Sequence, residues 1–372
     1  MARPVTFQET RRPLRPIPAG RAYRLLNVQS HLLLNVVAHS NAESARLEQF
    51  PVSQANRMSY TWHVFPLDFG RYLLVNMSSG FVVNIVSNST RPSAPAEQFH
   101  LQAPQDRPTQ EWVLRHVAGS FDEYEVINAE SQLNLNVVGF SRQASARVEQ
   151  FTRASGSDFL SQRWAFLVER EYRPVLDLQP GNDSIGDVNR MTSFADPKPA
   201  STTPVLAGSM AYPFPLVRDP AYSRERQARE NPYYILRKFG FWTKVFFYDH
   251  GGASEYTHRE TTRVGLTTTN STTVEHTTGI SVSAEASFGF RGFGASLSTT
   301  MSQQLRVETT KTVSHESSRE VEITRTYPAG RRVAEAIWYR DDRFVLERLD
   351  GSRVLEWVTR NPNRTVADTF RG

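Results

Sequence analysis

The sequence predicts an all-β protein with two parts, an N-terminal β-trefoil and an elongated β-sandwich or stalk module that carries an amphipathic hairpin. Three observations predict this: a pattern that recurs three times in the first half, a length of 372 residues, and a proline-free stretch rich in Ser and Thr in the second half. A chain of this length exceeds the size at which one hydrophobic core usually keeps growing, so two domains are expected. We place the parts at residues 1–19 (an N-terminal extension), 20–172 (the trefoil), 173–232 (a Pro-rich connector) and 233–372 (the second module).

The composition limits the chemistry that the chain can carry. It contains no cysteine, which excludes disulfides, thiol catalysis and cysteine-ligated metals. The formal net charge is +5, but Lys and Arg are scattered among acidic residues, and the most basic stretch, Arg224–Arg237, also contains Glu225 and Glu230. Because nucleic-acid binding requires a continuous basic surface, we expect no nucleic-acid partner.

No part of the sequence resembles a secretion or membrane signal. Residues 1–18 are rich in Arg and Pro and lack the apolar segment of a signal peptide. No stretch approaches the roughly 18 apolar residues of a membrane-spanning helix. We therefore expect a protein that is secreted or released without a conventional signal peptide and that is soluble before it assembles.

A pattern of about fifty residues occurs three times, beginning near Tyr23, Tyr72 and Tyr124. In each copy an Asn is followed thirteen positions later by Glu-Gln-Phe, and a tryptophan comes near the end of the copy. One copy is too small to bury its apolar face, whereas three copies around a pseudo-threefold axis can share one core. This arrangement is a β-trefoil, and we expect its core to include Leu34, Val83, Leu135, Trp62, Trp112 and Trp164.

Two of the three copies contain a motif that resembles the Gln-x-Trp signature of the ricin-type β-trefoil lectins. These are Gln110-Glu111-Trp112 and Gln162-Arg163-Trp164, whereas the first copy has Tyr60-Thr61-Trp62. The resemblance covers residues 20–172 and implies that the domain binds cell-surface glycans, with galactose-type sugars among the candidates. It also implies the binding residues, one set in each copy: Asn35, Glu48, Phe50 and Ser59; Asn84, Glu97, Phe99 and Thr109; and Asn136, Glu149, Phe151 and Ser161.

The implied residues have chemistry that suits a sugar. A carboxylate and an amide can hydrogen-bond to vicinal hydroxyls, and an aromatic ring can cover the apolar C–H face. Two departures bear on which sugar is preferred: the early position is Asn where the family usually has Asp, and the second is Glu where it often has Gln. A structural alternative stays open, in which the Asn residues form turns, the Phe residues belong to the core, and the copies are alike because symmetry requires it.

The second half begins with the irregular connector and then turns to strands. Within the connector, Asp219-Pro220 and Asn231-Pro232 bracket a short charged helix. Strands are expected from Tyr233 onward, and the tail should form three more, at residues 333–339, 344–348 and 353–358, with a hairpin turn at Asp350-Gly351.

Ser and Thr make up nearly two residues in five between Thr261 and Thr326, and the whole stretch is predicted to form long extended strands. Apolar and small polar residues alternate in its centre, on both sides of an expected turn at Arg291-Gly292. One face of this hairpin would hold Ile280, Val282, Ala284, Ala286, Phe288, Phe290, Phe293, Ala295, Leu297 and Met301. The other face would hold Ser281, Ser283, Glu285, Ser287, Ser296, Ser298 and Thr300.

Each arm of the hairpin has roughly the 9–11 residues that a tilted strand needs to cross a bilayer. Because every backbone polar group must be paired in lipid, one hairpin cannot span alone, and several copies must close a β-barrel together. Lipid would then contact the apolar face, and water in the pore lumen would contact the polar face. The alternative is a half-buried hairpin of a soluble β-sandwich, with its apolar face on the core.

A Ser/Thr-rich extended module that encloses an amphipathic insertion loop resembles the aerolysin-type β-pore-forming toxins, some of which carry a ricin-type trefoil. Together the two resemblances imply a non-enzymatic toxin that binds glycans, forms a homo-oligomer on the target-cell membrane and inserts its hairpin. We expect no catalytic residue, no cofactor and no metal site. Two alternatives stay open: a non-lytic multivalent lectin, and a carbohydrate-binding module attached to a glycoside hydrolase, which would need two facing carboxylates in its second domain.

Overall fold

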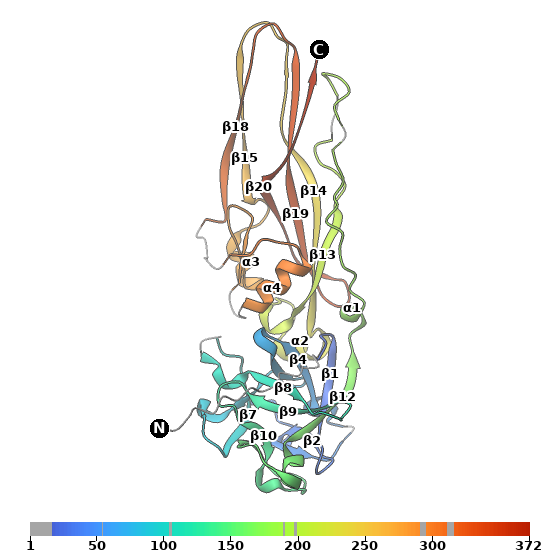
Figure 1. Ribbon diagram of the computed structural model, residues 1–372, viewed down its shortest axis with the longest axis vertical. Coiled ribbons are helices and arrows are strands. Elements are labelled where there is room, and N and C mark those ends of the chain that lie inside the picture. Colours follow the sequence, from blue (N-terminus) through green and yellow to red (C-terminus); the bar gives the residue numbers. More distant parts are fainter. Residues whose placement is uncertain are drawn as a thin grey trace, which may run out of the picture. The chain divides into compact units, whose positions relative to one another are not determined.

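The computed structural model describes residues 17–53, 55–103, 106–188, 190–196, 199–290, 295–310 and 316–372 (Figure 1). The chain divides into two compact units, Met1–Arg170 and Glu171–Gly372. Each unit is built mainly on its own antiparallel sheet, which confirms the all-β class predicted from the sequence. No helix in the described part of the chain is both long and apolar enough to span a membrane.

The first unit is a β-trefoil, as predicted, with four strands in each of its three repeats. The outer strands of neighbouring repeats pair, β4 with β5, β8 with β9 and β12 with β1, and the inner strands form the hairpins β2–β3, β6–β7 and β10–β11. The bounds are β1 (Arg21–Asn27), β2 (Leu33–Val36), β3 (Leu47–Phe50), β4 (Thr61–Pro66), β5 (Arg71–Asn76), β6 (Val82–Ile85), β7 (Ala94–Phe99), β8 (Trp112–His116), β9 (Glu123–Asn128), β10 (Asn134–Val137), β11 (Val148–Phe151) and β12 (Arg163–Glu171).

The core of this unit contains the residues that the repeat predicted. Leu34, Val83 and Leu135 are fully buried, as are the three tryptophans Trp62, Trp112 and Trp164. Each indole N–H donates to the backbone carbonyl of the buried aliphatic residue of its own repeat, at 3.2, 3.1 and 3.1 Å respectively. The tryptophan is therefore both a core side chain and a tie between the last strand and the inner hairpin of its repeat.

A second set of repeated polar residues joins one repeat to the next. Asn27, Asn76 and Asn128 are fully buried, and each donates its side-chain amide to a backbone carbonyl of the preceding repeat around the axis, at 2.8–3.0 Å. Gln49 donates in the same way to the carbonyls of Ser141 and Gln143, at 3.0 and 2.8 Å. These residues are repeated because the fold needs them, whatever the domain binds.

The second unit is organised by a sheet with the strand order β13-β14-β19-β20-β15-β18 (Figure 1). Strands β14 and β19 pair from Ile235 opposite Glu347 to His250 opposite Val333. A cluster of buried residues that includes Phe246, Val264, Ile323 and Ile337 packs β15 and β18 against β14 and β19. The bounds are β13 (Val205–Pro213), β14 (Tyr233–His250), β15 (Tyr256–Leu266), β18 (Ser318–Tyr327), β19 (Val333–Glu347) and β20 (Arg353–Arg371).

The connector and the tail differ from the predictions in their details. Within residues 173–232, β13 pairs with β14, so part of this region belongs to the sheet. The predicted charged helix is present as α2 (Arg224–Glu230), but Ser223 rather than Asp219 caps it, and a shorter helix, α1 (Arg173–Leu176), precedes it. In the tail, the first two predicted strands form the single strand β19, and the expected turn brings Gly351 to a φ angle of 85°.

The prediction that the whole Ser/Thr-rich stretch is extended is wrong. Between β15 and β18 lie α3 (Ser271–Thr278), β16 (Ile280–Val282), β17 (Phe288–Phe290) and α4 (Ala295–Gln304). Helix α3 forms because Asn270 accepts a hydrogen bond from the Thr272 amide at 2.8 Å and Gly279, with a φ angle of 70°, ends the helix. Local capping of this kind outweighs the weak β preference of threonine.

The predicted hairpin is also absent in this arrangement of the chain. β16 pairs with β17, with Ile280 opposite Phe290, so the first arm folds back on itself. The predicted return strand is wrong here, because Ala295, Ser296, Leu297, Ser298, Thr300 and Met301 lie on α4. Leu297, Met301 and Leu305 recur every four residues in the sequence, so the stretch that alternates as a strand also has the period of a helix. Phe293 and the predicted turn at Arg291-Gly292 lie outside the described residues.

Candidate functional site

In the first repeat, three of the four residues predicted to bind a sugar form a hydrogen-bonded cluster. Asn35 on β2 lies directly opposite Glu48 on β3, and its Nδ2 donates to Glu48 Oε1 at 3.0 Å. Ser59, in a 3-10 helix at Arg57–Tyr60, donates its hydroxyl to Asn35 Oδ1 at 2.9 Å. The pairing register of the inner hairpin therefore explains the spacing of thirteen residues seen in the sequence.

The other two repeats reproduce this geometry. Asn84 donates to Glu97 and Asn136 to Glu149, both at 3.0 Å. Thr109 donates to Asn84 at 3.0 Å, and Ser161 donates to Asn136 at 2.9 Å. All of these residues are buried, and the three glutamates retain only 5–6% of their exposure. The structure thus holds three copies of one carboxylate, amide and hydroxyl cluster.

The predicted aromatic residues lie beside these clusters. Phe50, Phe99 and Phe151 each follow the glutamate by two positions, so their rings project from the same face of the strand as the carboxylate. Each ring is half-buried. A half-buried ring beside a carboxylate is the combination that can cover the C–H face of a sugar while its hydroxyls are hydrogen-bonded.

The position four residues after each Asn was missed by sequence reasoning. It holds His39, Asn88 and Phe140, all in the left-handed region with φ angles of 54°, 51° and 53°. His39 Nδ1 lies 2.8 Å from Ser59 Oγ, Asn88 Oδ1 lies 2.8 Å from Thr109 Oγ1, and the Phe140 ring packs edge-on against Phe151. Because the residue type differs in every repeat, no threefold signal marks this position.

The three carboxylates also differ in their surroundings. Arg46 bonds to Glu97 Oε2 at 2.9 Å, whereas Pro95 lies at the corresponding place opposite Glu149. Burial raises the pKa of Glu149 above its usual value, although the hydrogen bonds from Asn136 and Ser93 act in the other direction. The third site therefore holds a carboxylate that takes up a proton more readily than an exposed one.

The Asn of each cluster is satisfied within the protein, since its amide nitrogen and its oxygen are both bonded to neighbours. The carboxylate and the ring remain to meet a ligand, although Glu97 Oε2 already accepts from Arg46 and Glu149 also accepts from Ser93. This geometry fits both sugar binding and a purely structural role. The hydrogen bonds hold a carboxylate in place for a ligand, and they also stabilise the inner hairpin.

The segment predicted to enter membranes is packed against the sheet of the second unit. Ile280, Val282, Ala284, Phe288 and Met301 are 1–4% exposed, and the Phe288 ring lies 5.0 Å from that of Phe344. Of the residues predicted to line a pore, Ser281 and Ser283 are buried and Glu285 is exposed. A side chain on Gly208 would place its Cβ 2.5 Å from the backbone oxygen of Gln304, so the end of α4 approaches β13 backbone to backbone.

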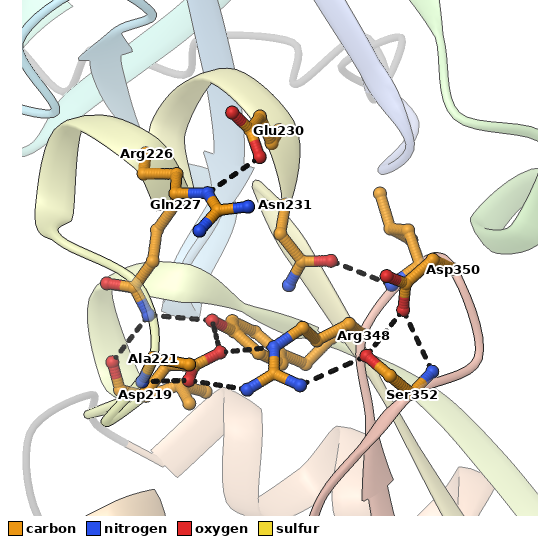
Figure 2. Close-up of polar contacts among 12 residues, drawn as sticks. Asp219, Ala221, Arg226, Gln227, Glu230, Asn231, Arg348, Asp350 and Ser352 are labelled. Carbon is orange, nitrogen blue, oxygen red and sulfur yellow. Dashed lines mark hydrogen bonds and ion pairs between the residues drawn. The ribbon is translucent and has the colours of Figure 1, made fainter.

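A buried charge cluster joins the α2 region to the turn between β19 and β20 (Figure 2). Asp219 accepts two hydrogen bonds from Arg348 at 2.7 Å and one from the Tyr234 hydroxyl at 2.8 Å, and its side chain is fully buried. Gln227 donates to the same hydroxyl, and the amide of Leu349 donates to Asn231 Oδ1 at 2.7 Å. Every charged group here has a protein partner, so the cluster stabilises the fold. Among the described residues, no three His, Asp or Glu side chains are placed to hold a metal ion.

Comparison with known protein families finds a match within each unit. Residues 15–99 match the family described as ricin-type beta-trefoil lectin domain-like, and residues 205–372 match the insecticidal crystal toxin P42 family. These matches confirm the resemblance seen in the sequence, a ricin-type trefoil followed by an aerolysin-type toxin module, and the arrangement fits a carbohydrate-binding toxin. Neither family is an enzyme family. Comparison with curated protein sequences gave no match.

Several solved structures are similar to this chain at low sequence identity. The crystal structure of Cry35Ab1 matches 95% of this chain and 90% of its own, with a TM-score of 0.72 and 15% identity. The designed threefold-symmetric protein ThreeFoil matches 39% of this chain and 97% of its own, with a TM-score of 0.36 and 24% identity. The ricin B-like lectin of Macrolepiota procera, solved with lactose, matches 41% of this chain and 97% of its own, with a TM-score of 0.34 and 15% identity.

Proposed function

We propose that this protein is a glycan-binding pore-forming toxin without enzymatic activity. It is soluble before assembly and binds cell-surface carbohydrate through the three trefoil sites. On the target membrane it forms a homo-oligomer, and each copy inserts one hairpin into a shared transmembrane β-barrel. The order of the two units, a lectin-type trefoil before a toxin module, supports a protein that first binds glycans and then acts on the membrane.

The observation that carries the proposal is the register of β15 and β18. These strands flank the inserting segment and pair without a shift from Tyr256 opposite Tyr327 to Gly265 opposite Ser318. If this register continued into the segment, each step would add one residue from either side. The turn would then fall between Arg291 and Gly292, where the alternating pattern of the sequence also predicts it.

The continued register would also place apolar residues on one face of the hairpin and polar residues on the other. Val282 would lie opposite Met301 and Phe288 opposite Ala295, so apolar residues meet across the strands. Ser283 would lie opposite Thr300 on the other face. A shift of one residue would place Val282 opposite Thr300 or Ser302, and Phe288 opposite Gly294 or Ser296, so apolar side chains would no longer meet. The register set by strands outside the segment is therefore the one that an amphipathic hairpin requires.

The same apolar residues are buried before any insertion, which explains why the segment would stay folded in water. Exposing Ile280, Val282, Phe288 and Met301 would cost roughly 6–12 kcal/mol, at about 1.5–3 kcal/mol for each side chain. That sum is comparable to the whole stability of a typical domain, about 5–15 kcal/mol. Release is favourable only where another apolar phase, such as lipid, receives these side chains.

A disulfide that locks the folded arrangement tests the proposal. Ser281 and Gly289 lie directly opposite each other in β16–β17. In the extended hairpin they would be eight residues apart on one strand, roughly 26 Å. In a variant with Ser281→Cys and Gly289→Cys, oxidation should block dye release from liposomes that carry mixed glycolipids, and reduction should restore it. The chain has no native cysteine, so the pairing is unambiguous.

The matched control is a disulfide that the proposed change would leave intact. Thr257 and Thr326 have hydroxyls 3.0 Å apart and stay paired in the proposed pore, so Thr257→Cys with Thr326→Cys should leak whether oxidised or reduced. Dye release by the oxidised Ser281→Cys, Gly289→Cys variant would refute insertion of this segment. Glycan binding with no leakage by the unmodified chain, under any lipid or protease treatment, would leave a non-lytic multivalent lectin.

A further inference from the structure

The two-stranded ribbon of β15 and β18 has two open edges. Within the described residues, β18 pairs with β15 alone, and β15 pairs with another strand only where Gly265 and Leu266 meet β20. The outer edges of both strands are therefore free of strand partners over most of their length. Neither strand contains a proline or a bulge, which are the devices that commonly keep an edge from pairing with another chain.

One face of this ribbon is exposed, and its charges are sorted by strand. On this face β15 carries Arg259 and Arg263, and β18 carries Glu320 and Glu322. The other positions of the face are Ser, Thr and Gly: Thr257, Thr261, Gly265, Ser318, Thr324 and Thr326. On this face one edge of the ribbon is thus basic and the other acidic, whereas on the opposite face β18 carries Arg319 and Arg325 and β15 carries Glu260.

These charges are only weakly engaged within one copy. Arg259 and Glu322 approach each other at 3.6 Å, but their side chains remain 65% and 51% exposed. Arg263 donates to the hydroxyl of Ser318 instead of to a carboxylate. The charged groups are therefore available to a partner.

We infer that this ribbon is the interface between neighbouring copies, so that the β18 edge of one copy pairs with the β15 edge of the next. Since β15 and β18 run in opposite directions, two copies side by side in the same orientation make this new pairing antiparallel. Glu320 and Glu322 of one copy then face Arg259 and Arg263 of its neighbour. The inference rests on the proposed function, which requires the copies to assemble side by side on a membrane.

The charge pattern selects a head-to-tail ring over a symmetric pair. Joining two β18 edges would place glutamates opposite each other, and joining two β15 edges would do the same with arginines; like charges across strands are destabilising. An interface made of two different edges repeats from copy to copy until the ring closes. Because β15 and β18 lead directly into the inserting segment, one continuous ladder would connect the ribbon to the proposed barrel.

Two full-length variants with reversed charges test this interface. On the exposed face, Glu320→Arg with Glu322→Arg makes both edges basic, and Arg259→Glu with Arg263→Glu makes both edges acidic. On glycolipid liposomes, each variant alone should lose cross-linkable oligomers and dye release by about tenfold or more, because like charges then meet at every junction. An equimolar mixture should recover both, since every basic edge can then pair with an acidic one.

The control variant carries the same type of change outside the ribbon, Glu225→Arg with Glu255→Arg, and both positions are exposed. It should oligomerise and release dye as the unmodified chain does. Thermal melting without liposomes checks that each variant is folded. Assembly of either reversed variant by itself, or a mixture that fails to recover, would overturn the interface and leave the pore intact. An unmodified chain that neither oligomerises nor leaks on any liposome would instead overturn the proposed function.

Discussion

The ammonium of Lys238 lies 2.9 Å from the backbone oxygen of Arg306, which joins the middle of β14 to the chain directly after α4. The Lys238 side chain is 1% exposed, with Asp183 and Asp342 each 3.7 Å from its nitrogen. Burial lowers the pKa of Lys238, although the two carboxylates raise it. A buried cation thus holds one end of the segment that we propose to insert.

Replacing this cation should make the segment easier to release. Lys238→Met keeps much of the apolar side chain but leaves the Arg306 oxygen without its donor, at a cost of about 1–3 kcal/mol. We expect faster dye release and faster proteolysis between β15 and β18, with glycan binding unchanged. Lys244→Met on the same strand is the control, because its ammonium lies over the Phe247 ring, 5.4 Å from the centroid. Equal leakage rates for Lys238→Met and the unmodified chain would show that this contact does not limit release.

Asp219 should make the second unit sensitive to acid. Burial by itself raises its pKa, but the hydrogen bonds from Arg348, the Ala221 amide and Tyr234 lower it below the usual value. Because the pKa is lower in the folded state, the contribution of the carboxylate to stability is complete above its unfolded pKa of about 3.9. That contribution is lost as the pH falls through the folded pKa. We expect the melting temperature of the unit to fall below about pH 4.

The variant Asp219→Asn checks the source of this acid sensitivity. It leaves the partly exposed Arg348 without its carboxylate, so at neutral pH it should be less stable by about 1–3 kcal/mol, the usual loss for a hydrogen bond to a charged group. It should also lose part of the acid dependence. Asp350→Asn, at an exposed position on the neighbouring turn, should change stability far less. A melting curve of Asp219→Asn that follows pH as the unmodified chain does would assign the acid sensitivity to other carboxylates.

The trefoil could be predicted because the residues that each repeat of a threefold-symmetric fold requires recur three times in the sequence. The buried aliphatic residue, the asparagine and the tryptophan at fixed spacing each correspond to a core layer or a hydrogen bond of the repeat. Helix α4 could not be predicted, because residues 295–305 satisfy both the strand period and the helix period, and packing against β13 decides between them. Asn270 and Gly279, which cap α3, are start and stop signals of a helix in the sequence. The high content of Ser and Thr nevertheless favoured the prediction of a strand.

The third trefoil site should lose its ligand first on acidification. Burial raises the pKa of Glu149, so a proton binds it at a higher pH than an exposed glutamate and removes one acceptor for sugar hydroxyls. In a variant with Phe50→Ala and Phe99→Ala, only this site remains, and its affinity should fall as the pH drops. Adding Pro95→Arg places a cation beside Glu149, as Arg46 lies beside Glu97 in the second repeat. This cation should move the midpoint of the loss of binding to lower pH. Ala118→Arg, on an exposed turn, is the control; an unchanged midpoint with Pro95→Arg would mean that another group titrates.

Substitution of the rings separates the functional interpretation of the clusters from the structural one. Phe50, Phe99 and Phe151 are half-buried, so changing all three to Ala should lower the glycan affinity of each site about fivefold, at roughly 1 kcal/mol of stacking for each ring. Asn35→Leu, by contrast, leaves the buried Glu48 without its donor and should cost about 1–3 kcal/mol of stability. Normal glycan binding by the triple variant, measured by calorimetry, would leave the symmetry of the fold as the reason for the repeated residues.

The residues of the trefoil sites could be predicted only at positions where all three repeats have the same or a similar residue type. Nine residues of the clusters were found because their types recur, and their hydrogen bonds follow from the strand register. His39, Asn88 and Phe140 differ in type and left no repeated signal. Lys238 was missed for another reason: its partners are a backbone oxygen 68 residues away and two aspartates from other segments, and no local pattern reports such contacts.

Alternating probes along the first arm should distinguish an inserted strand from a segment that merely contacts lipid. Single cysteines at Ser281, Val282, Ser283 and Ala284 carry a polarity-sensitive dye. All four positions are buried in the folded unit, at 2–9% exposure, so the four dyes have similar surroundings before insertion. Because successive side chains of a strand point to opposite faces, dyes at Val282 and Ala284 should be quenched by lipid-borne quenchers on liposomes, and dyes at Ser281 and Ser283 by iodide in water. Burial alone cannot produce such alternation, and a helix would give a period near four. Four dyes that respond alike on leaking liposomes would therefore mean that this segment does not line the pore as a strand.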